Sequence, residues 1–141
     1  FYGILKPMDG VTPYRLEMQA KAEIEETANL YDYWGDRLYH SVIDDSRTVI
    51  NLASKEYSKC IERYLSDKDN YITITFCELS GDKLVTKGTY AKMARGEMVR
   101  FMAENNIENP VDIQKFDRLG YTFRGNLSSE TEYVFERKVI K

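Results

Sequence analysis

Residues 72–106, with the sequence ITITFCELSGDKLVTKGTYAKMARGEMVRFMAENN, decide the fold of this chain. From residue 72 to 77, isoleucine and phenylalanine alternate with threonine and cysteine, and this period of two predicts a strand with one buried face. Gly81-Asp82 is a turn signal, so residues 83–87 are expected to return as a second strand. The first half of the stretch therefore predicts a β-hairpin.

The second half, residues 91–106, has the period of an amphipathic helix. When successive residues are placed about 100° apart, its apolar side chains fall within one arc of roughly 100°. These side chains are Ala91, Ala94, Met98, Phe101 and Met102. Lys92 and Arg100 lie well away from the arc and Arg95 lies at its border, so the outward side of the helix is expected to be basic.

Strand and helix patterns also occur on both sides of this stretch. The expected strands are 14–18, a buried strand at 47–52, and a closing hairpin of 121–123 with 133–139. Helices are expected over 30–43, with Asn29 as its cap, and over 110–116, with Asn109 as its cap. Another helix is expected after Ser54. Its apolar stripe consists of Ala53, Tyr57, Cys60, Ile61 and Tyr64. Because strands and helices interleave irregularly, the expected fold class is α+β, with a mixed, mostly antiparallel sheet and packed helices.

The composition fits a single domain over residues 1–141. Hydrophobic residues make up 43% and charged residues 30% of the chain, which excludes disordered and low-complexity classes. No apolar run approaches the roughly 18 residues that span a bilayer, and no signal peptide is recognisable, so we expect a cytoplasmic protein without a membrane partner. The chain opens on Phe1 and not on methionine, which suggests a fragment of a longer protein.

Few residues are suited to metal or covalent chemistry. Cys60 and Cys77 lack CxxC spacing and are expected to be reduced thiols, and His40 has no second histidine beside it, so neither zinc nor another cofactor is expected. Glycine-rich phosphate loops and nucleophile elbows are absent from the sequence.

The remaining candidates are polar residues near expected strand ends and helix starts, where binding sites are often built. They are Arg15, Glu17, Asp36, Asn51, Ser54, Glu56, Lys92 and Arg95. Each also has an ordinary structural role open to it. Asp36 could be a surface acid, Ser54 a helix cap, and Arg15 with Glu17 a cross-sheet pair.

Charge is distributed unevenly along the chain. The net charge of −3 argues against a nucleic-acid binder, because that class usually carries a basic excess. Residues 82–100, however, hold five cations against two acids, whereas residues 17–36 hold one cation against six acids. A basic strand and helix in an acidic chain can mark a phosphate-binding face, and the alternative is a helix face that is merely solvated.

Several blocks of the sequence together resemble the YaaA family of peroxide stress resistance proteins. The blocks are Tyr2-Gly3, Pro7, Asp9, Pro13-Tyr14-Arg15-Leu16-Glu17-Met18, Tyr33-Trp34-Gly35-Asp36, Asn51-Leu52-Ala53-Ser54, Glu56-Tyr57, Tyr90-Ala91-Lys92, Ala94-Arg95-Gly96, Arg100-Phe101 and Gly120-Tyr121. They cover essentially the whole chain and correspond to the C-terminal portion of that family, which implies that an N-terminal segment is missing.

The resemblance implies a bacterial cytosolic protein that helps cells survive peroxide and limits free intracellular iron. It also implies an α+β body with a basic cleft and a helix-hairpin-helix element associated with DNA binding. By this resemblance, residues 91–106 and 110–116 form that element. The N-terminus of the second helix would offer free backbone N–H groups to a phosphate.

We therefore expect a non-enzymatic, YaaA-like DNA-binding protein that contacts the backbone of double-stranded DNA. The expected contacts are Arg15, Lys87, Lys92, Arg95 and Arg100. The expected cleft-lining residues are Glu17, Asp36, Asn51 and Ser54. Arg15, Asn51, Lys92 and Arg95 are expected to converge on one concave surface, and apolar surface left uncovered in a fragment would favour self-association.

Two other functions are open. The first is an enzyme acting on a nucleic acid or nucleotide, with Glu17, Asp36 or Glu56 as acid or base beside Lys92. A buried carboxyl with a raised pKa near the basic cluster would favour it. The second, direct iron sequestration by carboxylates, ranks last because the sequence has no Glu-x-x-His motif.

Overall fold

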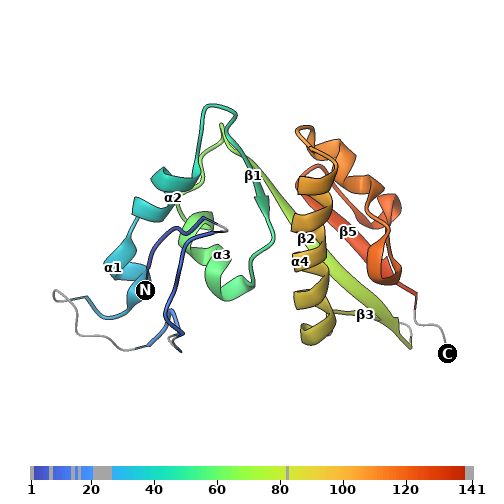
Figure 1. Ribbon diagram of the computed structural model, residues 1–141, viewed down its shortest axis with the longest axis horizontal. Coiled ribbons are helices and arrows are strands. Elements are labelled where there is room, and N and C mark those ends of the chain that lie inside the picture. The colour runs from blue at the N-terminus through green and yellow to red at the C-terminus, as the bar shows by residue number, and fades with distance from the viewer. Residues whose placement is uncertain are drawn as a thin grey trace. The chain divides into compact units, whose positions relative to one another are not determined.

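The computed structural model describes residues 2–6, 8–13, 15, 17–20, 27–81 and 83–138, and the chain packs as two compact units (Figure 1). The first unit contains the described residues up to Val49 together with Ala53–Asn70. The second contains Ile50–Leu52 and the described residues from Tyr71 onward. Each unit is considered by itself. None of the described helices is both long and apolar enough to cross a membrane.

A mixed sheet forms the second unit, as the sequence predicts. Its strands run in the order β1-β2-β5-β4, with β3 also paired to β2. The strands are β1 (Thr48–Asn51), β2 (Asn70–Ser80), β3 (Lys83–Val85), β4 (Tyr121–Phe123) and β5 (Glu132–Arg137). β2 pairs antiparallel with β3 and parallel with β5, and β5 pairs antiparallel with β4. Both predicted hairpins are therefore confirmed, although Asp82 and Val139 lie outside the described residues.

Helix α4 (Gly88–Glu104) packs its predicted apolar face onto this sheet (Figure 1). Ala91, Ala94, Met98 and Phe101 are buried, and they share one core with Ile72, Ile74 and Phe76 of β2. Small alanines on the buried face allow the helix to approach the strands closely. Aromatic rings fill the rest of this core, and the ring centroids of Phe76 and Phe116 are 5.9 Å apart.

Three short 3₁₀ helices complete the second unit. They are η1 (Pro110–Lys115), η2 (Arg118–Gly120) and η3 (Gly125–Leu127). The predicted cap of η1 is confirmed, because the Asn109 side chain accepts a hydrogen bond from the Val111 N–H at 3.0 Å. The helix-hairpin-helix element is not confirmed, since its second arm is this six-residue 3₁₀ helix and its cap already occupies one of the free N–H groups.

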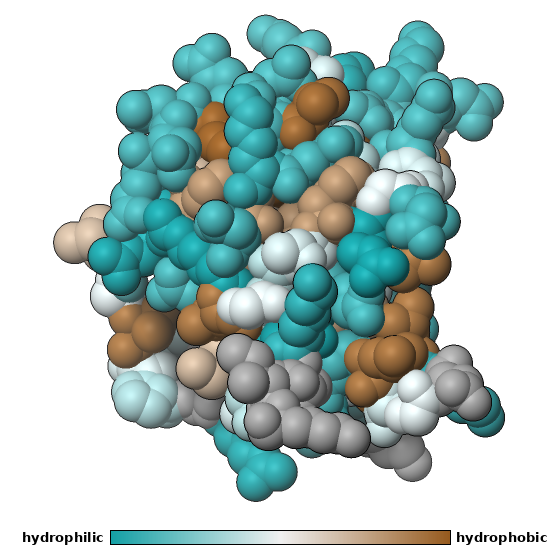
Figure 2. Space-filling view, turned by 90° about the vertical axis from the view of Figure 1, so that its right-hand side faces the viewer, coloured by the Kyte–Doolittle hydropathy of each residue, from teal (hydrophilic) through white to brown (hydrophobic). Residues whose placement is uncertain are grey.

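The face of the second unit seen in Figure 2 is largely hydrophilic. Hydrophobic side chains appear there in separate groups between hydrophilic ones. Self-association of the chain stays a prediction.

Three short helices form the first unit: α1 (Leu30–Trp34), α2 (Arg37–Val42) and α3 (Lys55–Glu62). Asn29 caps α1 as predicted, accepting a hydrogen bond from the Asp32 N–H at 3.1 Å. The predicted continuous helix over 30–43 is wrong, because the chain breaks at Gly35. Gly35 has φ 52° and ψ −135°, a conformation open mainly to glycine, and it ends α1 before α2 begins.

Two further expectations for the first unit are wrong. Arg15 and Glu17 have no regular structure, and Met18 lies in a turn. The described part of 14–18 is therefore not a strand, and Arg15 and Glu17 do not form a cross-sheet pair. Tyr14 and Leu16 lie outside the described residues. Tyr57, placed on the buried stripe of its helix, is 51% exposed. The helix itself is confirmed, with Cys60 buried.

Candidate nucleic-acid interface

Helix α4 carries two of the predicted phosphate contacts, Lys92 and Arg95, on one flank. They are three residues apart, and side chains with that spacing are neighbours on a helix. Lys92 is exposed, and Arg95 is half-buried at the border of the apolar face, as the helical pattern predicts. We call these two residues the α4 cation pair.

The charges of the α4 cation pair are not neutralised in the described part of the chain. Neither the Lys92 side chain nor the Arg95 side chain makes an ion pair or hydrogen bond with the described residues. The Nε atom of Arg95 is buried and has no hydrogen-bond partner among those residues. A buried donor without an acceptor costs free energy in the folded chain.

Arg100, a third predicted contact on α4, is held by acids. Its Nε lies 2.7 Å from Oε1 of Glu104, and Nη2 of Arg118 lies 2.6 Å from Oε2 of the same side chain. Arg118 also pairs with Glu97 at 3.4 Å. Hydrogen bonds from Arg100 and then Arg118 lower the pKa of Glu104, so two cations are balanced by two carboxylates. Arg100 therefore offers less free charge than the α4 cation pair.

Lys87, a fourth predicted contact, pairs with a buried acid that sequence reasoning missed. It occupies the N-cap position of α4 and forms an ion pair with Glu78, which is 1% exposed. Nη2 of Arg137 lies 2.5 Å from the other carboxylate oxygen of Glu78, and the Arg137 guanidinium carbon lies 3.6 Å from the centroid of the Tyr90 ring. Hydrogen bonds from Lys87 and then Arg137 lower the pKa of Glu78.

A signal for Glu78 does exist in the sequence. It occupies the next inward position after Ile72, Ile74 and Phe76, so a charged residue continues a buried stripe of the strand. A carboxylate at such a position requires cations close to it.

The other predicted site residues are distributed over both units. Asn51 is buried on β1 in the second unit, where its Nδ2 donates to Thr73 Oγ1 at 3.3 Å. The remaining ones belong to the first unit: Arg15, Glu17, Asp36 and Ser54. Arg15, Glu17 and Asp36 are exposed. Oδ2 of Asp36 lies 3.3 Å from Nε2 of His40.

Two further candidate residues, Ser54 and Glu56, lie at the start of α3. Ser54 is the N-cap of α3, although its side chain makes no capping hydrogen bond. Glu56 accepts a hydrogen bond from the Met18 N–H at 2.8 Å. The structure thus brings Lys92 and Arg95 together on one helix, and the wider convergence with Arg15 stays a prediction.

Within the described ranges, no group of three or more His, Cys, Asp or Glu side chains is placed to hold a metal ion. Both cysteines are buried, and burial raises the pKa of each thiol.

Comparison with known proteins identifies the same family over most of the chain. The model of the family described as "Peroxide stress protein YaaA" matches residues 1–127. A "UPF0246 protein" of Agathobacter rectalis is 78% identical over 139 residues, covering 99% of this chain and 56% of that protein. A "UPF0246 protein" of Lachnoclostridium phytofermentans is 55% identical over 135 residues, covering 96% of this chain and 53% of that protein. The chain therefore spans about half the length of these curated relatives.

Proposed function

Because this chain belongs to the YaaA family of peroxide stress proteins, we propose that it serves the response to peroxide by binding the DNA backbone through the α4 cation pair. One observation carries the proposal: Lys92 and Arg95 are neighbours on α4, and neither side chain forms an ion pair with an acid among the described residues. Phosphate oxygens that reach the charged ends of these two side chains would neutralise both charges.

Contacts of this kind give affinity without reading the base sequence. They also give an affinity that falls steeply with salt, because neutralised phosphates release counterions. The expected ligand is therefore double-stranded DNA of any sequence. The basic surface is local, which reconciles DNA binding with a net charge of −3.

A role in limiting free intracellular iron is the second part of the proposal, and only the family resemblance supports it. We infer that this effect follows from DNA binding. Cells that carry Lys92→Ala with Arg95→Ala should then resemble a deletion strain in their free iron, measured after peroxide exposure by the paramagnetic signal of chelated iron. A variant that loses DNA binding but keeps free iron low would separate the two roles.

The test of DNA binding measures fluorescence anisotropy of two labelled duplexes of unrelated sequence over a range of salt concentrations. Lys92→Ala and Arg95→Ala should each weaken binding equally for both duplexes. Each should also lower the slope of log affinity against log salt by about one unit. Arg100→Ala is the matched control on the same helix, and it should change the slope less because Glu104 already opposes its charge.

An unchanged salt slope in both α4 variants would overturn the proposal. So would a loss of binding confined to one duplex, because base readout would then be involved. The Agathobacter rectalis relative is measured in parallel, since this chain covers 56% of it and the rest of that protein could add further cations. Thermal unfolding of every variant separates lost contacts from lost folding.

No observation favours the enzymatic alternative enough to propose it. That function needs a carboxyl with a raised pKa beside a cation. Four described carboxyls have a displaced pKa, and each is lowered, first by a hydrogen bond that the carboxylate accepts. They are Asp44, Asp69, Glu78 and Glu104.

A further inference from the structure

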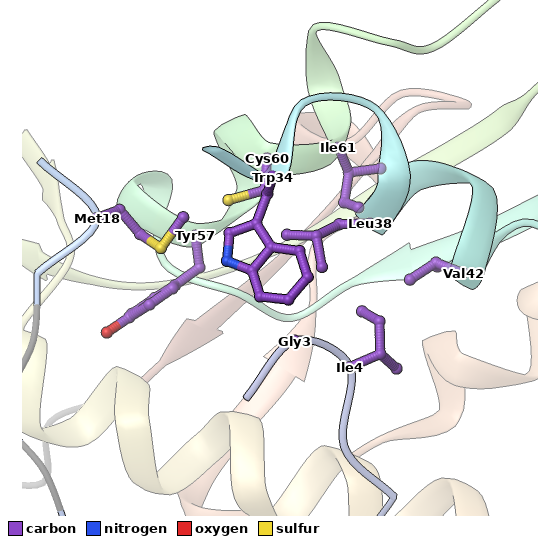
Figure 3. Close-up of a pocket in the computed structure, with 9 residues that line it drawn as sticks. All are labelled: Gly3, Ile4, Met18, Trp34, Leu38, Val42, Tyr57, Cys60 and Ile61. Atoms are coloured by element: carbon purple, nitrogen blue, oxygen red, sulfur yellow. The ribbon is translucent and has the colours of Figure 1, made fainter. Parts of the chain in front are cut away.

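The first unit contains an apolar pocket of about 220 Å³ (Figure 3). Trp34 and Leu38 come from α1 and α2, Cys60 and Ile61 come from α3, and Gly3 and Met18 come from the chain before these helices. In Figure 3 the Trp34 indole lies near the centre, between the sulfur atoms of Met18 and Cys60 on one side and Leu38 on the other. The pocket thus has an aromatic wall and walls of aliphatic and sulfur groups.

None of the described residues that line the pocket carries a charge. Cys60 is buried, and that burial raises the pKa of its thiol, so the thiol stays neutral at physiological pH. Burying an ion here would cost much free energy, because the lining groups that the structure describes include no countercharge. The walls therefore favour a neutral ligand.

The approach of Gly3 to Trp34 depends on glycine. Gly3 has φ +76°, and a Cβ atom at this position would stand 2.9 Å from Cη2 of Trp34. Any larger residue would push the indole ring or the segment around Gly3 out of place. Gly3, Met18 and Trp34 lie far apart in the sequence, and they meet at this pocket.

We propose that this pocket binds a small neutral aromatic molecule, of the size of one substituted ring or a small fused pair of rings. Apolar cavities of about 150 Å³ bind benzene, so a pocket of about 220 Å³ has room for a slightly larger ring system. A flat ring can stack against or meet the edge of the Trp34 indole. A second protein chain would instead need a contact area of many hundreds of Å². The inference is independent of DNA binding, because none of its residues lies in the second unit.

Trp34 is the single tryptophan of the chain, so its fluorescence reports on the pocket directly. Nitrobenzene, a neutral planar quencher, is titrated into the full chain. Saturable quenching is expected, and phenol should reverse it at several-fold lower concentration than cyclohexanol, which is similar in size but not planar.

Val42→Phe supplies the positional test, because Val42 lines the pocket and is 37% exposed, so a larger side chain can narrow the pocket without filling the core. Val111→Phe is the matched control, at a valine that is 56% exposed in the second unit. Saturable quenching that Val42→Phe weakens and Val111→Phe leaves unchanged supports the proposal.

Four results would overturn the proposal. Quenching that rises linearly without saturation would show only collisions. Saturable quenching that Val42→Phe leaves unchanged would place the probe elsewhere. Equal displacement by cyclohexanol would exclude selection for a flat ring. Binding to this chain but not to the longer Agathobacter rectalis relative would show that another segment of such proteins occupies the pocket.

Discussion

The Nη2 atom of Arg137 lies 2.5 Å from Oε2 of Glu78, a residue that is 1% exposed on the inward face of β2. Lys87 contacts the other oxygen of the same carboxylate. A buried acid between two cations joins β2, β5 and the start of α4 at one point. Removing one member of such a cluster leaves buried charge without a partner, which is strongly destabilising.

Glu78→Gln should therefore lower the thermal midpoint of unfolding by several degrees at neutral pH. The pKa of Glu78 in the folded chain is below its ordinary value of 4.5, first because of the hydrogen bond from Lys87. Its carboxylate therefore stabilises the fold at every pH above that ordinary pKa. This contribution to stability is lost as the pH falls through the lowered pKa. The difference in midpoint between wild type and Glu78→Gln should be largest near pH 7 and should close in acid.

Glu130→Gln is the control for this pH series, because Glu130 is exposed. It should track the wild type throughout. A difference for Glu78→Gln that stays constant from neutral to acidic pH would mean that the loss of packing, and not the loss of charge, sets the stability.

Two glycine substitutions should have opposite effects. Gly35→Ala should destabilise the chain by about 1–3 kcal/mol, because φ 52° with ψ −135° is a conformation that alanine rarely adopts. Gly96→Ala lies within α4 with open space around it, and it should stabilise the chain by about 0.5–1 kcal/mol. Urea unfolding of both variants measures the two changes. Equal effects of the same sign would contradict the assignment of Gly35 as the break between α1 and α2.

The region around Gly35 shows a limit of prediction from the sequence. The apolar spacing of α4 and the alternation of β2 are repeated signals, so the helix, the hairpins and the mixed sheet were all predictable. Over 30–43 the apolar spacing continues through the break, and only the backbone angles at Gly35 show that two helices form.

Predicting the site from the sequence has a similar limit. The position of Arg95 at the border of its helix follows from the helical period. Whether a cation is neutralised depends on contacts across the fold, such as the one between Glu104 and Arg118, fourteen residues further along the chain. Arg100 and Arg95 are both predicted phosphate contacts, and in the structure only Arg100 is paired with an acid among the described residues.

Both cysteines should react slowly with peroxide and with thiol reagents in the folded chain. Burial raises the pKa of Cys60 and of Cys77, and the thiolate, which is the reactive form, is correspondingly scarce at pH 7. Labelling by a chromogenic disulfide should be slow in buffer and fast in guanidinium chloride. Rapid labelling of either thiol in buffer would show that its segment opens readily.

Arg95→Met should raise stability while it weakens DNA binding. Methionine keeps an unbranched apolar stem at the border of the α4 core and removes a buried Nε that has no acceptor among the described residues. Relief of that unsatisfied donor is worth about 1 kcal/mol, and it should appear as a higher thermal midpoint without DNA. Lys92→Met, at an exposed position, should change stability by less than about 0.5 kcal/mol.

The two measurements on Arg95→Met separate a binding residue from a structural one. A structural arginine would be stabilising, so its replacement would lower the midpoint, and any loss of DNA binding would follow from loss of folding. An arginine that binds a phosphate gains its anionic partner only in the complex, so in the free protein its half-buried charge costs free energy. A higher midpoint together with weaker DNA binding and a smaller salt slope is therefore the expected result. A lower midpoint would show that the guanidinium already has its partner within the chain.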